Sequence, residues 1–215
     1  MKTLFVIAAA TLSCAPVAAA TVTNGSMTGP EAAFRAPAGW TITGTPDTRS
    51  ADDTGGAFLA NPGVSPDGGT WAMLGSEGRS FTEGLSQTVS DFIVGATYEV
   101  SWYISNPGCC ASVAVANYDA TNRISFLLDG SVVYGGTSIP LGTGWLRESY
   151  GFTATSTSTR IGFLLGSGVR SYLALDGVTI SEVSDVPAPA APLLLFAGVA
   201  GMIVVRQRQR RTASS

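Results

Sequence analysis

Apolar and polar side chains alternate without interruption in the stretch TYEVSWYIS at residues 97–105. Successive side chains of an extended strand point to opposite faces of a sheet, so this pattern separates two sets. The apolar set consists of Tyr98, Val100, Trp102 and Ile104. The more polar set consists of Glu99, Ser101, Tyr103 and Ser105. The stretch is therefore predicted to be a half-buried strand of an antiparallel sheet.

The same two-residue period recurs at residues 124–128, 161–165 and 173–180. The inward-facing residues of these stretches are predicted to be Ile124, Phe126, Leu128, Ile161, Phe163, Leu165, Leu173, Leu175, Val178 and Ile180. The period slips by one residue at Asp176-Gly177, which predicts a β-bulge. Asp129-Gly130 predicts a hairpin turn. No segment of the middle region sustains a 3.6-residue period, so residues 21–184 are predicted to form an all-β jelly roll or other β-sandwich.

Charge and residue usage exclude several classes of function. Residues 21–192 carry seven arginines, no lysine and fifteen acidic residues, which gives a net charge near −8. Binding of nucleic acid requires a basic surface that neutralises phosphates, so no nucleic-acid partner is expected. The whole chain contains no histidine, which excludes Ser-His or Cys-His catalysis and metal sites with histidine ligands.

Two adjacent cysteines, Cys109 and Cys110, lie in the middle region. Adjacent residues cannot join distant parts of a fold, and two thiols alone do not make a structural zinc site. In an oxidising compartment, three states stay open. The cysteines form a strained vicinal disulfide ring, pair with another chain, or stay reduced and partly buried.

Several phrases of the sequence occur in an order that resembles a known fold family. They include TNGSM at residues 23–27, SPDGGTWAML at 65–74 and LALDGVTISEV at 173–183. With the strand patterns between them, they resemble the galactose-binding-like jelly rolls of bacterial surface proteins and of several carbohydrate-binding modules. The resemblance implies a jelly-roll fold and makes polysaccharide a candidate partner.

The same resemblance implies a candidate metal position. In such modules a structural calcium often joins the first and last strands, and the acid of the final LD-x-V phrase is a typical ligand. Asp176 occupies that position here, whereas the usual second acid is replaced by Thr28, with Glu31 three residues further on. Calcium requires six or more oxygen ligands. The alternative is that Asp176 only organises the bulge, and no other cofactor is expected.

A glycan-binding surface is predicted on the polar face of the strand at residues 97–105. Sugar rings stack their apolar faces on exposed aromatic side chains that lie beside polar groups. Tyr103, flanked by Glu99 and Ser101 on the same face, fits this requirement. The tryptophans are instead expected to lie in the core, where large aromatic side chains dominate packing; they are Trp40, Trp71, Trp102 and Trp145.

The N-terminus has the three parts of a secretory signal peptide. Lys2 provides the early positive charge, and residues 4–12 form a short apolar run. Small residues then stand at Ala18 and Ala20, where a signal peptidase requires them. Residues 1–20 are therefore predicted to be a signal peptide that is cleaved between Ala20 and Thr21.

The C-terminus combines an apolar run with a basic cluster. Residues 193–205 are apolar or glycine, and residues 188–192 extend the run to about 27 Å of helix. This run is predicted to be a single transmembrane helix. The cluster that follows, in residues 206–215, predicts a cytoplasmic tail and an outward-facing sandwich by the positive-inside rule; it consists of Arg206, Arg208, Arg210 and Arg211.

A proline-containing motif precedes the apolar run, within residues 185–192. It reads Val186, Pro187, Ala188, Pro189 and Ala190. Motif, apolar run and arginine cluster together resemble the PEP-CTERM class of sorting signals, in its V-P-x-P-A variant. The resemblance implies an exosortase-type membrane protease as a partner, which removes the anchor at the inner membrane. The processed protein is then expected at the cell surface or outside the cell.

One functional hypothesis is preferred and two alternatives stay open. The first is an exported noncatalytic surface or extracellular-matrix protein whose jelly roll binds polysaccharide. The second is a structural or adhesion module without a small ligand. The third is a glycoside hydrolase, which requires two carboxylates at a set separation across a cleft. No recognisable motif carries such a pair, so the protein is not expected to be an enzyme.

Overall fold

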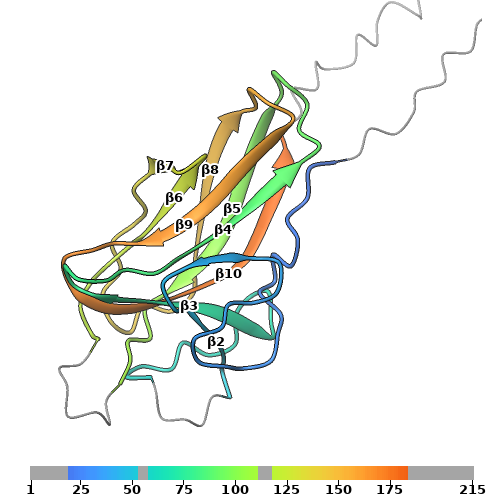
Figure 1. Ribbon diagram of the computed structural model, residues 1–215. Coiled ribbons are helices and arrows are strands. Elements are labelled where there is room, and N and C mark those ends of the chain that lie inside the picture. The colour runs from blue at the N-terminus through green and yellow to red at the C-terminus, as the bar shows by residue number, and fades with distance from the viewer. Residues whose placement is uncertain (1–18, 53–57, 111–117, 184–215) are drawn as a thin grey trace, which may run out of the picture. The chain divides into compact units, whose positions relative to one another are not determined.

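The computed structural model describes residues 19–52, 58–110 and 118–183, and all secondary structure in these ranges is β-strand. The strands form two antiparallel five-stranded sheets packed face to face (Figure 1). The predicted all-β sandwich is therefore confirmed. The sorting motif, the apolar run, the basic tail and most of the predicted signal peptide lie outside the described residues.

The first sheet, named here the β9 sheet after its central strand, has the strand order β1-β4-β9-β6-β7. Its strands are β1 (Thr41–Thr43), β4 (Gly84–Ser90), β9 (Ser158–Leu165), β6 (Ile124–Leu128) and β7 (Ser131–Tyr134). The second sheet, the β10 sheet, has the order β2-β3-β10-β5-β8. Its strands are β2 (Asp47–Ser50), β3 (Thr70–Glu77), β10 (Arg170–Glu182), β5 (Thr97–Ser105) and β8 (Leu146–Thr153).

Successive strands alternate between the two sheets almost throughout. From β1 to β10, only two connections join strands within one sheet, the one from β2 to β3 and the one from β6 to β7. The connection from β6 to β7 is the predicted hairpin, and both of its turn residues have positive φ, 47° at Asp129 and 84° at Gly130. Two positive φ angles define the type I′ turn, whose twist matches that of the flanking strands.

The core lies between the sheets and is built from the predicted alternating residues. Trp102 is fully buried, and its ring centroid lies 5.2 Å from those of both Phe126 and Phe163. All the residues predicted to face inward belong to this core or pack against it. The indole Nε1 of Trp102 donates a hydrogen bond of 3.2 Å to the buried carboxylate of Glu148, so this polar group also has a partner.

The predicted bulge lies in β10. The pairing of β10 with β5 shifts between Asp176 and Thr179, which lets Val178 return to the inner face. Gly177 has φ of 59°, and a Cβ atom there would lie 2.8 Å from the ring of Tyr103. Glycine is therefore required at this position by both backbone conformation and space.

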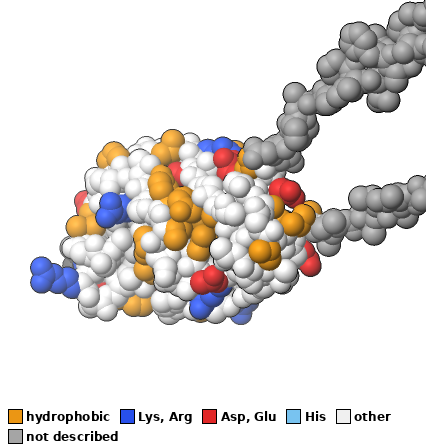
Figure 2. Space-filling model, turned by 90° about the horizontal axis from the view of Figure 1, so that it is seen from above, with side chains coloured by type: hydrophobic (Ala, Val, Ile, Leu, Met, Phe, Trp, Pro, Cys, Tyr) orange, Lys and Arg blue, Asp and Glu red, His pale blue; other side chains and the backbone are white. Residues whose placement is uncertain are grey.

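The outer face of the β10 sheet carries a second, smaller apolar cluster. Trp71, Met73 and Ala174 are buried there, with Phe58 and Trp145 packed against them. The rings of Trp71 and Trp145 meet edge to face at 5.3 Å. On the face shown in Figure 2, most of the surface is uncharged and the charged side chains are scattered.

The predictions for the chain ends stay predictions. Within residues 19–52, 58–110 and 118–183, no helix is long and apolar enough to cross a membrane. At the predicted cleavage position, Ala20 is buried against the core and Thr21 is exposed.

Candidate functional site

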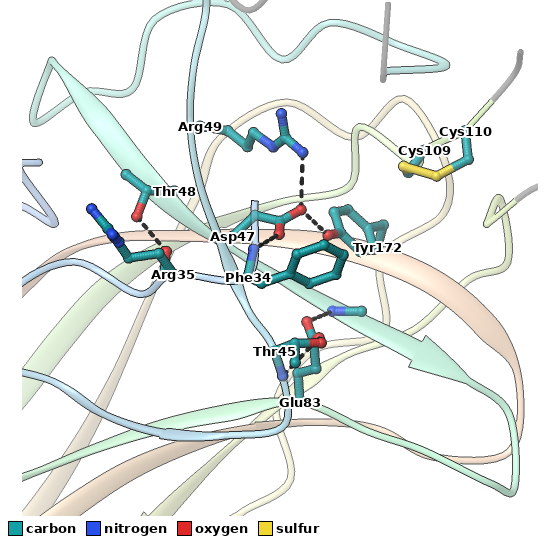
Figure 3. A network of polar contacts seen from close by, with 11 residues as sticks. Phe34, Arg35, Thr45, Asp47, Thr48, Arg49, Glu83, Cys109, Cys110 and Tyr172 are labelled. Carbon is teal, nitrogen blue, oxygen red and sulfur yellow. Dashed lines mark hydrogen bonds and ion pairs between the residues drawn. A yellow bond between two sulfur atoms is a disulfide. The ribbon is translucent and has the colours of Figure 1, made fainter. Parts of the chain in front are cut away.

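A cleft of about 370 Å³ lies at the β2 edge of the β10 sheet, on its outer side (Figure 3). Strands β2, β3 and β10 form part of it, together with the segments that precede β2 and β4. Its polar lining includes Thr45, Asp47, Arg49, Ser76, Glu77, Glu83, Tyr118 and Tyr172, and its other lining residues include Phe34, Phe81, Cys109 and Cys110.

Asp47 is the centre of the polar network in this cleft. It is only 4% exposed, and its Oδ1 accepts a hydrogen bond of 2.7 Å from the backbone N–H of Phe34. Its Oδ2 lies 3.1 Å from Nη2 of Arg49 and also accepts a hydrogen bond from the hydroxyl of Tyr172. Burial, and then the negative charge of Asp47, raise the pKa of Tyr172, so the phenol stays protonated and donates to the carboxylate.

Glu83 is the second buried carboxylate of the cleft. It accepts hydrogen bonds from the backbone N–H of Gly75 at 2.6 Å and from the N–H and hydroxyl of Thr45 at 3.1 and 2.9 Å. Burial raises the pKa of Glu83, and these hydrogen bonds oppose the increase. Glycine is needed at position 75 because a Cβ atom there would lie 2.6 Å from the ring of Tyr172 and 3.3 Å from the Glu83 carboxylate. Glu83 therefore ties the segment before β2 to strand β3.

Phe34 stands at the cleft with an unusual combination of properties. Its side chain is 74% exposed, and its backbone φ is 58°. A left-handed backbone is uncommon for a bulky residue and carries strain. The hydrogen bond from its N–H to the buried carboxylate of Asp47 holds this conformation in place. The backbone that carries the exposed ring is thus held at the cleft, and hydrophobic burial does not explain the position of the ring.

Cys109 and Cys110 form part of the wall of the cleft. Of the three states left open by the sequence, the structure has the vicinal disulfide. The backbone of Cys109 pairs with that of Tyr118 through two hydrogen bonds of 3.3 Å. The Tyr118 ring in turn meets the ring of Tyr172 edge-on at 6.0 Å. The disulfide segment is thereby connected to the aromatic floor of the cleft.

The residues of the predicted glycan surface share one face of β5 but lie outside this cleft. Glu99 pairs with Arg147 at 3.1 Å, and Ser101 is buried, with its hydroxyl 2.9 Å from that of Thr179. Tyr103 is half-buried against Gly177. The side chains are brought together as predicted, but only Glu99 and Tyr103 keep appreciable exposed surface.

Asp176, the predicted calcium ligand, is fully buried beside the bulge. Neither of its carboxylate oxygens has a hydrogen-bond partner of good geometry within the described residues. Burial raises the pKa of Asp176 to about 7, an increase that nearby Ser65 and the Gly177 backbone partly offset. Two orphaned oxygens fit a cation, yet no group of three or more Asp, Glu, His or Cys side chains suited to a metal occurs within the described residues. Glu31 instead accepts a hydrogen bond from Ser50.

The central residues of the cleft were not predicted from the sequence. Asp47 and Tyr172 are 125 positions apart, and β2 spans four residues, too few to show a period. Phe34 is in no strand, so no alternation indicates that its side chain is exposed. Only the polar residues Asp47 and Arg49, spaced two apart, carried a weak signal of a shared face.

No family model and no curated protein matches the chain. Solved structures of similar fold include the CBM22-1 xylan-binding domain of Paenibacillus barcinonensis Xyn10C, with 16% identity, 68% of this chain and 86% of that chain covered, and a TM-score of 0.43. A family 35 carbohydrate-binding module from Clostridium thermocellum has 10% identity, coverages of 71% and 98%, and a TM-score of 0.39. The enzymatically active domain of tailspike protein 4 from bacteriophage CBA120 has 17% identity and a TM-score of 0.46. The match covers 75% of this chain and 21% of that chain, so this chain spans about a fifth of that domain. The functional argument therefore rests on the cleft itself.

Proposed function

We propose that this protein is a noncatalytic glycan-binding module and that the Asp47 cleft is its binding site. The observation that carries the proposal is Phe34, an exposed aromatic ring held at a cleft by a hydrogen bond to a buried carboxylate. Exposure and a positive φ both disfavour a phenylalanine at this position. A bound apolar surface compensates for both, and the apolar face of a sugar ring supplies one.

The polar groups of the cleft complement the remaining part of a sugar. Sites for small ligands combine apolar walls with a few fixed polar groups that set orientation. Here the Tyr172 hydroxyl, which donates to Asp47, keeps an oxygen that accepts from a sugar hydroxyl. The Tyr118 hydroxyl donates a hydrogen bond of 2.7 Å to Glu77, and the oxygens of both side chains add further acceptors. Phe81 provides a second apolar wall.

Binding without hydrolysis fits the state of the two buried carboxylates. A hydrolase requires one carboxyl group to protonate the leaving group and another to act on the opposite side of the bond. Glu83 is 3% exposed, and three donors of its own chain occupy it. Asp47 likewise has partners on both oxygens. Both acids hold the cleft in shape instead of facing a substrate.

Retention on immobilised cellulose, xylan and starch tests this proposal with three variants of the purified protein. Phe34→Ala removes the exposed ring and should weaken retention at least about tenfold, the effect expected of a central aromatic contact. Val64→Ala is the matched control, because Val64 is an exposed apolar residue outside the cleft. Tyr103→Ala probes the surface predicted from sequence. If Tyr103→Ala alone reduces retention, the site lies on β5. If the unmodified protein binds none of the three, the structural-module alternative is favoured.

We further propose that the protein reaches the outside of the cell through its two terminal segments. The support is the order of the signal peptide, the motif at residues 186–190, the apolar run and the arginine cluster. The intact mass of protein recovered from the cell surface should correspond to a chain that lacks residues 1–20 and 193–215. A mass that includes residues 193–215 would contradict processing and indicate a retained anchor.

A further inference from the structure

The outer face of the other sheet, the β9 sheet, carries a groove made of two adjoining hollows. The larger has a volume of about 440 Å³ and the smaller about 100 Å³, and Leu164 lines both. The larger hollow is lined by Thr82, Thr121, Asn122, Arg123, Ser125, Ser138, Leu164, Leu165, Gly166, Ser167 and Val169. The smaller continues over β4, β9 and β6 to Arg160. Hydroxyl groups dominate the lining of the larger hollow.

The charge of this groove is opposite to that of the protein. Among the described residues, no acidic side chain lines either hollow, although acidic residues outnumber basic ones by fifteen to twelve over the whole chain. Within residues 19–52, 58–110 and 118–183, the exposed guanidinium of Arg123 has no ion-pair or hydrogen-bond partner. Arg160 donates a hydrogen bond of 2.7 Å to Ser86, which fixes its position on the same face. The guanidinium groups of Arg123 and Arg160 are therefore both available to a ligand in the groove.

The length of the groove suits a polymer. Arg160, Gly162 and Leu164 alternate along β9 and so share its outer face. The backbone of Arg123 lies level with Gly166, whose N–H donates to the Arg123 carbonyl at 2.9 Å. Six residues of strand separate this level from Arg160, which corresponds to about 20 Å. A single small anion cannot reach both arginines over this span.

Glycine keeps the middle of the groove open. Gly84 lines the smaller hollow, and a Cβ atom there would lie 2.6 Å from the carbonyl oxygen of Phe163. Gly162 lies on the neighbouring strand β9, where it pairs with Ser86, two residues away from Leu164, the residue that pairs with Gly84. With no side chains at either position, the floor between the two arginines stays low.

The groove and the Asp47 cleft lie on opposite sides of one extended segment. Phe81 and Glu83 line the cleft, whereas Thr82 lines the groove. Neighbouring residues of an extended segment point to opposite sides, so the two sites have a common wall. Their chemistry nevertheless differs, because Asp47, Glu77 and Glu83 line the cleft and no acid lines the groove.

We infer that this groove is a second binding site and that it takes an anionic, hydroxylated polymer, an acidic polysaccharide whose carboxylates pair with Arg123 and Arg160. Guanidinium groups bind carboxylates through paired, charge-assisted hydrogen bonds. The hydroxyl groups of Ser138, Ser167 and Thr121 provide donors and acceptors for the sugar hydroxyls. The inference does not depend on the Asp47 cleft being a binding site.

Affinity electrophoresis of the purified protein in gels that contain polygalacturonate tests the inference. Arg123→Ala should weaken retardation about tenfold, as expected for the loss of one charged pair. Arg79→Ala is the matched control, because Arg79 is exposed and lines neither hollow. The melting temperature should stay unchanged in both variants, since neither guanidinium has a partner to lose in the part of the chain that the structure describes. Equal weakening in the two variants, or no retardation of the unmodified protein, would overturn the proposal.

Two further comparisons separate this site from general charge effects and from the cleft. Polyglutamate has the carboxylates without the sugar hydroxyls, and retardation equal to that by polygalacturonate would overturn the assignment to a polysaccharide. Phe34→Ala should leave polygalacturonate binding unchanged, while Arg123→Ala should leave retention on neutral polysaccharides unchanged. A failure of the groove is thus distinguishable from a failure of the cleft.

Discussion

Two regions on the outer face of the β10 sheet contain a carboxylate and an arginine at the same distance. Asp47 lies 3.1 Å from Arg49 at the β2 edge, and Glu99 lies 3.1 Å from Arg147 near the β8 edge. Their surroundings differ, because the first pair has side-chain exposures of 6% and 22% and the second of 40% and 53%. The two ion pairs therefore differ in energy despite their equal distances, because water screens the exposed pair.

The two regions also differ in how firmly the carboxylate is held in place. Asp47 has further partners in the Phe34 amide and the Tyr172 hydroxyl, so its position is set by several elements at once. Glu99 has one more partner, the hydroxyl of Ser149 at 3.3 Å. A ligand that meets the Asp47 region finds groups already fixed in place, which lowers the entropy lost on binding.

Removing each carboxylate should give the largest contrast between the regions. Asp47→Ala leaves Arg49 and Tyr172 without their buried partner and should lower the free energy of unfolding by about 3–5 kcal/mol. Glu99→Ala breaks an exposed pair and should cost about 0–1 kcal/mol. Urea denaturation of both variants measures the two values. Equal losses would mean that burial does not distinguish the pairs.

Asp176, which pairs with Tyr103 across β10 and β5, should make stability depend on pH. Its folded pKa of about 7 lies above the ordinary value of 3.8, so the folded protein binds this proton more tightly than the unfolded chain does. Stability should then be greatest below about pH 4 and fall as pH rises to about 7, by at most about 4 kcal/mol. The melting temperature of Asp176→Asn should lack this component.

Calcium provides the control for that prediction. If Asp176 binds the ion, calcium should raise the melting temperature at pH 7 in the unmodified protein and leave Asp176→Asn unaffected. A pH profile that Asp176→Asn reproduces would show that another group titrates. An absence of any calcium effect would favour the view that Asp176 only organises the bulge.

The vicinal disulfide should have the smallest effect on stability. It closes a very short loop and so restricts the unfolded chain little, which predicts a change below about 1 kcal/mol on reduction. Because Cys109 and Cys110 line the cleft, reduction should instead weaken retention on neutral polysaccharide. Thiol alkylation should add no label before reduction and two labels afterwards. Labelling of the untreated protein would contradict the disulfide.

The sequence was sufficient for the inner part of the sandwich. Strands β5, β6, β9 and β10 were predicted from their two-residue period, and the hairpin and bulge were predicted from Asp129-Gly130 and Asp176-Gly177. These features follow from local rules, since burial of one face requires alternation and positive φ favours glycine or aspartate. The core residues could therefore be predicted without knowing the order of the strands in the sheets.

The cleft depends on contacts that no local rule contains. Its polar groups come from three separate parts of the chain: Asp47 from β2, Glu83 from the segment before β4, and Tyr172 from β10. Their buried hydrogen bonds can be recognised only once the order of the strands is known. The predicted surface at Tyr103 was an inference from alternation alone, which gives the face of a strand but not the residues that cover it. Burial of Ser101 against Thr179 illustrates that limit.

The alternation of strands between the two sheets has a consequence for how the chain folds. Because only β2 with β3 and β6 with β7 are neighbours both in sequence and within a sheet, the other six strand pairings must wait for the closure of a long loop. Folding of such topologies is slow, on the order of milliseconds to seconds. Until β10 enters between β3 and β5, those two strands have unpaired edges, which are sites of aggregation. Since β10 is the last strand, this period ends only when the chain has been supplied through residue 182.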